Sequence, residues 1–207
     1  MPRPTSATGW RVGQGGAVAE GWDWTRVQAE VCPQCGFDPA AHPLDGLGAD
    51  LRATAADWRA LLETSASDDL RRRPQPATWC ALELACHVRD AVAVFDERIA
   101  LTLAEDDPEL GWWDHEAAVD EQAYAAQDPA AVADGVEASL SALAETVAAI
   151  PAGGAWDRRA VRRAGEGFTV AGMARFTLHE AVHHLADAEA ALAGAKTSAA
   201  PDARDDR

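Results

Sequence analysis

The stretch TLHEAVHHLADAE, residues 177–189, lies in the last helical pattern of the chain and carries His179 and His183 four residues apart. Residues at i and i+4 of a helix share one face, with side chains about one turn, or ~6 Å, apart. The rest of this face carries small or apolar residues: Gly172, Phe176, Ala186 and Ala190. The face is therefore expected to point inward, where two imidazoles need polar partners. A metal ion would satisfy both; bonds to carbonyls or carboxylates are the alternative.

The same stretch matches the H-E-x-x-H pattern of zinc proteases. One class of these enzymes needs a glycine at position 186 and a third histidine at position 189, where this chain has Ala186 and Glu189. Alanine lets the helix continue where that class must turn. Another class takes a glutamate from a later helix, but few residues follow His183. The sequence therefore disfavours a protease, and the third metal ligand is expected upstream.

Along the whole chain, the apolar spacing predicts four amphipathic helices, at 48–65, 78–105, 129–150 and 170–192. Abundant alanine and few β-branched residues favour helix over strand. The pattern predicts an all-α four-helix bundle with a long crossover, residues 106–127, between helices two and three.

The chain divides into three expected parts. Residues 1–44 form an irregular N-terminal arm rich in Gly and Pro, residues 45–195 form the bundle, and residues 196–207 form a disordered tail. Residues 156–168 are expected to form an extended loop or a short hairpin.

His87 is the best upstream candidate for the third ligand, because it lies on the apolar side of helix two. It is about nine residues into that helix, or roughly 13 Å from its start, and His179 is similarly placed in helix four. If helix directions alternate, helices two and four run parallel and the three imidazoles share a level. Three histidine ligands and one open position are typical of a catalytic metal site.

The net charge of −16, with Lys196 as the single lysine, disfavours nucleic acid and anionic membrane surfaces as partners. The sequence shows neither an apolar run long enough to span a membrane nor a signal peptide, so a cytoplasmic protein is expected. A monomer and a homodimer both remain open.

Cys32-Pro33-Gln34-Cys35-Gly36 resembles half of a zinc ribbon, in which a tight turn aims two sulfurs at one ion. A second, structural zinc would need two more ligands. His42, Cys80 and Cys86 are the possible donors. A redox pair, or a reduced turn that pins the arm to the bundle, is the alternative.

Four stretches of the sequence resemble those of a known family. The pattern W-x-x-x-E-x-x-x-H-x-x-D is present as Trp79, Glu83, His87 and Asp90, and LHEAVHHLAD follows later in the chain. GWWDHEAAVD (111–120) and GEGFTVAGMARFTLHE add to the likeness. The chain resembles the DinB/YfiT-like superfamily of four-helix-bundle metalloproteins. The resemblance implies a divalent metal, zinc or nickel, on His87, His179 and His183, and several branches of the family use low-molecular-weight thiols such as mycothiol or bacillithiol.

The expected function is therefore metal-dependent transfer of a small thiol to an electrophilic molecule, or isomerisation of that molecule. A thiol at the open position loses its proton to the metal and becomes a nucleophile. Glu180 is a candidate catalytic proton shuttle. Glu83, Asp90 and Asp187 are candidates to orient the histidines, unless they are merely solvated. A non-catalytic metal-binding bundle, and a hydrolase using metal-bound water, are the alternatives.

The crossover contains Trp113, Asp114 and His115, which are candidates to line the mouth of the site and bind substrate. A loop held down by its tryptophans is an equally good interpretation. His184 points about 100° away from His183, so it is expected to pack at a helix interface.

Overall fold

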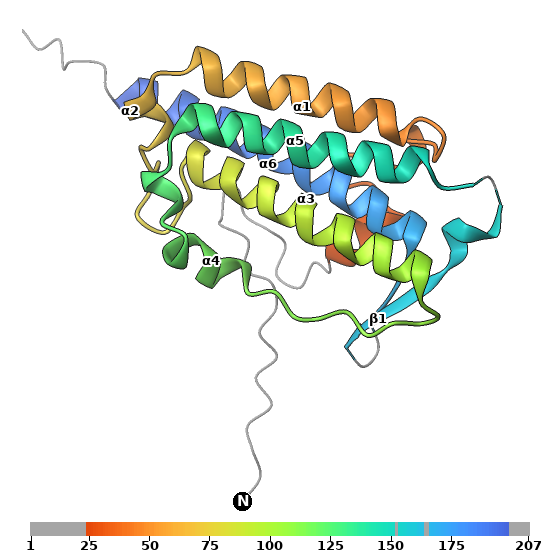
Figure 1. Cartoon of the computed structure of the whole chain (residues 1–207). Helices are drawn as coiled ribbons and strands as arrows, with labels where there is room; N and C mark the ends of the chain where they lie inside the picture. Colours follow the sequence, from red (N-terminus) through yellow and green to blue (C-terminus); the bar gives the residue numbers. More distant parts are fainter. Residues whose placement is uncertain (1–23, 152, 164–165, 199–207) are drawn as a thin grey trace, which may run out of the picture.

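Four long helices pack side by side in the computed structural model, which describes residues 24–151, 153–163 and 166–198 (Figure 1). They are α1 (Leu47–Thr64), α3 (Ala81–Ala104), α5 (Pro129–Ala148) and α6 (Val170–Ser198). The predicted all-α four-helix bundle is confirmed. The first part of the predicted arm, residues 1–23, lies outside the described residues, as do residues 199–207 of the predicted tail; α6 itself extends to Ser198.

Short elements precede α1 and connect the four helices. They are η1 (Trp24–Gln28), η2 (Pro39–Ala41), α2 (Ser67–Leu70), α4 (His115–Glu121), η3 (Tyr124–Ala126), η4 (Gly154–Asp157), β1 (Arg159–Arg163) and β2 (Glu166–Thr169). The two strands pair antiparallel, with Ala160 opposite Phe168, so the segment before α6 is a hairpin. Both of these side chains are buried, which anchors the hairpin to the core.

Side-chain caps fix where the helices begin. Asp128 accepts a hydrogen bond from the backbone N–H of Ala131 at 3.0 Å, and Pro129 follows it at the first helical position. Thr169 Oγ1 accepts one from Gly172 N–H at 2.9 Å. Helix α3 begins at Ala81, later than the sequence predicted, because the Glu83 carboxylate accepts from the backbone N–H of Cys80 at 2.8 Å and closes a capping box there.

The helix directions do not alternate. Early α3 meets late α6, where the rings of His87 and His184 are 5.0 Å apart, and late α3 meets early α6, where Phe95 and Phe176 are 5.1 Å apart. Helices α3 and α6 are therefore antiparallel, and the expectation that they run parallel is wrong. The reason is the crossover, which returns along the bundle so that α5 starts at the same end as α3 (Figure 1). The 24 residues of α3 span about 36 Å, a distance that a largely extended crossover can cover.

The core lies between the four helices and extends under the arm. Trp58 of α1 is fully buried, and its indole N–H donates to the carbonyl of Ala181 at 3.0 Å. This bond ties α1 to the turn of α6 that carries the histidines. Within the described residues, no helix is long and apolar enough to cross a membrane.

Candidate metal centres

One stretch of α6 carries four buried side chains suited to binding a metal ion: His179, Glu180, His183 and His184. At 3.6 residues per turn, neighbouring residues point about 100° apart, so the four divide into two pairs at i, i+4 spacing. His179 and His183 face the arm, while Glu180 and His184 face α3. The same stretch of helix therefore serves two separate groups of ligands.

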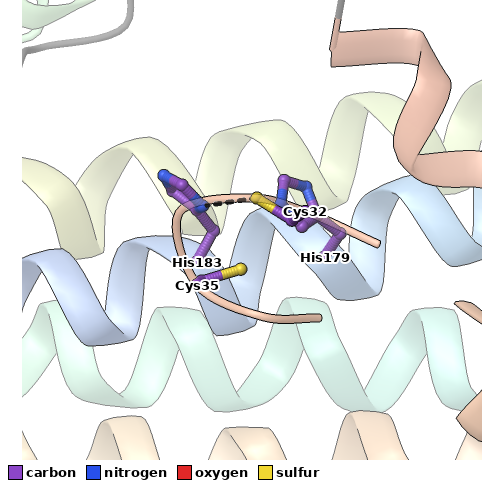
Figure 2. A group of neighbouring side chains, drawn as sticks. All are labelled: Cys32, Cys35, His179 and His183. Carbon is purple, nitrogen blue, oxygen red and sulfur yellow. Dashed lines mark hydrogen bonds between the residues drawn. The ribbon is translucent and has the colours of Figure 1, made fainter. Parts of the chain in front are cut away.

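The first group, here called the arm site, joins the cysteine turn to α6. It comprises Cys32, Cys35, His179 and His183, whose potential ligand atoms all lie within 4.8 Å of one another. Cys32 Sγ is 3.7 Å from His183 Nδ1. Figure 2 shows the turn of the arm passing beside α6 with both sulfurs next to the two imidazoles. Three of the four side chains are buried and Cys35 is partly exposed.

The geometry of the cysteine turn follows from its sequence. Gly36 adopts φ +75°, a conformation that glycine tolerates and other residues rarely adopt. This lets Gly36 N–H donate to Cys32 carbonyl at 3.0 Å, while Cys32 N–H donates to Phe37 carbonyl at 2.9 Å. Phe37 is buried with its ring edge-on to His179, at 5.4 Å between centroids. The turn thus holds both sulfurs toward α6.

The donors expected to complete the cysteine turn are elsewhere. His42 stacks on Phe37 at 4.7 Å and its Nδ1 lies 2.8 Å from Asp50. Cys80 begins α3, and Cys86 packs beside the backbone of Tyr124. The structure therefore does not group these three possible donors with the cysteine turn, and α6 presents two histidines beside the turn instead.

The second group, here called the bundle site, comprises His87 of α3 with Glu180 and His184 of α6. Glu180 Oε2 is 3.7 Å from His87 Nε2 and 3.6 Å from His184 Nε2. All three residues are buried, and His87 Nδ1 has no hydrogen-bond partner among the described residues. Such an orphaned buried nitrogen marks a place where a polar partner is expected.

The structure thus brings His179 and His183 together but places His87 in the neighbouring group. Because α3 and α6 are antiparallel, His87 lies level with His184 and not with His179. Glu180 stands between the two groups, with Oε1 3.7 Å from His179 Nδ1 and Oε2 toward His87 and His184. The predicted proton shuttle is therefore in position to be a ligand.

The protonation states within the arm site differ from residue to residue. Burial lowers the pKa of His179, but bonds with Cys32, Cys35 and Glu180 reverse this and raise it to about 11, so a metal ion must displace a proton there. Burial raises the pKa of the Cys32 thiol, but hydrogen bonds from His179 and from backbone N–H groups of the turn outweigh it and bring the pKa to about 7. Burial lowers the pKa of His183 to about 4, so its ring is neutral at pH 7. Thiolate and neutral imidazole are the forms that bind metals.

Burial and partners also set the charges in the bundle site. Burial lowers the pKa of His87 to about 4. Burial opposes ionisation of Glu180, yet hydrogen bonds from His179, His184 and His87 hold its pKa well below the usual range. Burial also lowers the pKa of His184, but Asp187 and Glu180 reverse this and raise it to about 9. An ionised carboxylate therefore lies among three imidazoles.

Of the three carboxylates expected to orient the histidines, Asp187 contacts them. Its Oδ2 is 3.2 Å from His184 Nδ1 and 3.5 Å from His183 Nε2. The other two bind partners away from the histidines. Glu83 accepts from Arg73 Nε at 2.9 Å and from Cys80 N–H. Asp90 accepts from Arg89 and from the hydroxyl of Tyr124.

Aromatic residues of the crossover cover the bundle site. The indole of Trp113, partly exposed, stacks on His87 with centroids 5.7 Å apart and planes 11° from parallel. His115 is buried 5.7 Å from the His87 ring, and Trp79 lies 5.2 Å from it. Asp114 is exposed and caps α4 by accepting from Ala117 N–H at 3.0 Å. Trp113 and His115 are thus placed at the site, whereas Asp114 has a structural task.

Both groups suit a metal ion by their chemistry. Two thiolates and two imidazoles are a typical zinc ligand set, and four protein ligands fill a tetrahedral ion. Two imidazoles and a carboxylate are the set that catalytic zinc sites use, with a position left open. The sequence carried a signal for the second group, since Glu180 and His184 repeat the i, i+4 spacing of His179 and His183.

Comparison with known proteins agrees with this architecture. The solved structure of YfiT from Bacillus subtilis, described as "a probable metal-dependent hydrolase with an unusual four-helix bundle topology", matches with a TM-score of 0.63 and 14% identity. The match covers 71% of this chain and 86% of YfiT. Among curated proteins, none gives a significant match. The family model of the DinB superfamily matches residues 50–188, so the chain belongs to the DinB superfamily.

Proposed function

We propose that this protein is a metal-dependent enzyme whose ion is held by His87, Glu180 and His184 of the bundle site. The observation that carries the proposal is the three-ligand group itself, with its potential ligand atoms within 4.8 Å of one another. Three protein ligands leave a coordination position for a reacting molecule. A bound divalent ion supplies a positive centre that lowers the pKa of a coordinated thiol or water.

The surrounding residues support such chemistry. Asp187 accepts from Nδ1 of His184, which leaves Nε2 of that ring toward Glu180 and His87. Burial lowers the pKa of His115 and so favours its neutral form, which has a free lone pair on one ring nitrogen. Trp79 and Trp113 shield the site from water.

The leading candidate reaction is S-transfer from a low-molecular-weight thiol, mycothiol-like, to a small electrophile, or isomerisation of that electrophile. Its support is the family resemblance together with an aromatic wall that fits an apolar electrophile. A free thiol has a pKa near 8.5, so only a modest shift is needed to produce the thiolate at pH 7. We infer that His115, whose ring lies 5.7 Å from that of His87, receives that proton.

Hydrolysis is the second candidate, with water as the nucleophile. Two observations favour it: the description of YfiT, and the two-histidine, one-glutamate ligand set that zinc peptidases also use. Both reactions would use the same open position, so only assays with both kinds of substrate separate them.

The test is metal-loaded protein assayed with a small thiol plus an aryl-halide electrophile, and separately with an activated aryl ester. We expect activity with one of these, and a loss of 100-fold or more in His87→Ala. His42→Ala is the matched control, since His42 is outside both ligand groups. If neither activity depends on the metal and on His87, the proposal fails and a non-catalytic metal-binding bundle is the better account.

A further inference from the structure

We propose that the arm site is a second, structural zinc site, in which Cys32 and Cys35 from the arm and His179 and His183 from α6 hold one ion tetrahedrally. The site is distinct from the bundle site, and this inference does not depend on the enzyme proposed above. In this proposal His179 and His183 bind the structural ion, while His87, Glu180 and His184 bind the ion at which the reaction occurs.

The geometry carries the proposal. Zinc binds sulfur at ~2.3 Å and imidazole nitrogen at ~2.0 Å, so tetrahedral ligand atoms stand about 3.3–3.8 Å from each other. Cys32 Sγ and His183 Nδ1 are 3.7 Å apart, and the remaining ligand atoms of the site are within 4.8 Å. Small rotations of the side chains bring all four to bonding distance.

A redox pair is the weaker explanation. Both cysteines are free thiols, and a disulfide between them would need no histidine. Here two imidazoles converge on the sulfurs from a different element of the fold, and Phe37 packs against the His179 ring to hold it there. A shared metal ion explains why potential ligands from two separate elements converge at one point.

The ion would fasten the arm to the bundle. Cys32 and His183 are 151 positions apart in sequence, so one zinc closes a very long loop. Within residues 24–44, the described part of the arm, the buried side chains outside the site are few: Val27, Phe37 and Pro39. Gln28 packs over Gly172, where an added Cβ would lie 1.9 Å from its Oε1. Zinc binding therefore supplies folding free energy that this short segment lacks.

Cobalt substitution tests the site directly, because a thiolate bound to Co²⁺ gives an intense near-ultraviolet charge-transfer band. We expect apo protein, reduced and titrated with Co²⁺, to bind about two ions, one of which gives this band. Cys35→Ser should reduce the band by about half, and Cys32→Ser with Cys35→Ser should abolish it and lower the stoichiometry to about one. His179→Ala should weaken cobalt binding at this site at least tenfold.

Two control variants make the result specific. Cys86→Ala removes a buried cysteine outside the site and should leave the band unchanged. His87→Ala should remove the other ion while the band persists. A wild-type protein that binds cobalt without the band overturns the proposal even if enzyme activity is intact. So does a band that survives the double cysteine variant, or one that disappears in His87→Ala.

Hydrogen exchange gives a second test that needs no variant. The amide of Cys32, which donates to Phe37 carbonyl, should exchange at least tenfold more slowly with zinc than after chelation. Equal exchange rates in the two forms would contradict a role for the ion in holding the arm.

Discussion

Replacing Glu83 with glutamine should weaken folding without releasing metal. The Glu83 side chain is buried, with 2% of its surface exposed, and it accepts from Arg73 Nε at 2.9 Å and from the backbone N–H of Cys80 at 2.8 Å. Glutamine keeps an acceptor for the N–H but loses the charge. A charge-assisted hydrogen bond contributes about 1.5–3 kcal/mol, and Arg73 is 40% exposed, so the lower part of that range applies. We expect Glu83→Gln to lower the free energy of unfolding by about 2 kcal/mol at pH 7.

The pH dependence of this cost has a definite sign. Burial opposes ionisation, but the bonds from Arg73 and Cys80 prevail and lower the pKa of Glu83 in the folded state. Its stabilising contribution is therefore present above the unfolded pKa of about 4.3 and is lost as pH falls through the lower folded value. The difference between wild type and variant should be full at pH 7 and should shrink below about pH 4.

The assay is chemical denaturation of both proteins from pH 7 to pH 3, with metal content measured on the same samples. Glu30→Gln is the matched control, because Glu30 also pairs with an arginine, Arg26, but on the exposed surface. The control should change stability by less than about 0.5 kcal/mol. A loss of stability in Glu83→Gln that does not change with pH, or a loss of metal from this variant, would contradict a capping role for Glu83 and support a direct role at the histidines.

Three further changes test other parts of the structure. Gly36→Ala should lower the free energy of unfolding by about 1 kcal/mol and weaken cobalt binding at the arm site, because Gly36 has φ +75°. Gly111→Ala is the control, since Gly111 also has open space for an added Cβ but no positive φ, and its cobalt titration should match the wild type. Trp58→Phe should lower the free energy of unfolding, measured by denaturation, by about 2–3 kcal/mol, because it removes the hydrogen bond to the Ala181 carbonyl and leaves a smaller ring. A loss below about 1 kcal/mol would contradict that contact. Trp113→Ala should raise KM several-fold in steady-state kinetics with metal content unchanged; an unchanged KM would remove Trp113 from the substrate wall.

Much of the fold could be predicted from local patterns. Asp128 and Pro129 start α5 as expected, and Thr169 caps α6, because capping depends only on neighbouring residues. Helix α3 begins at Ala81 and not at the predicted residue 78, because the Glu83 side chain reaches back to Cys80. Helix spacing also identified the inward face of α6 from Gly172 to His183, whereas Ala186 and Ala190, expected on the same face, are exposed.

The grouping of the ligands could not be predicted in the same way. It depends on the direction of α6 relative to α3, which the length of the crossover decides and helix periodicity does not. With the two helices antiparallel, His87 meets Glu180 and His184. It also depends on where the arm lies, since only the folded chain brings Cys32 under His183. His184 lies at the interface between α6 and α3, as expected, and is also a potential metal ligand.

The most direct test of two metal centres is a crystal structure of the zinc-loaded protein with anomalous diffraction measured at the zinc absorption edge. We expect two peaks. One should lie among Cys32, Cys35, His179 and His183, and the other among His87, Glu180 and His184. A single peak bounded by His87, His179 and His183, with both cysteines away from it, would contradict the account and restore the three-histidine site that the sequence alone favours.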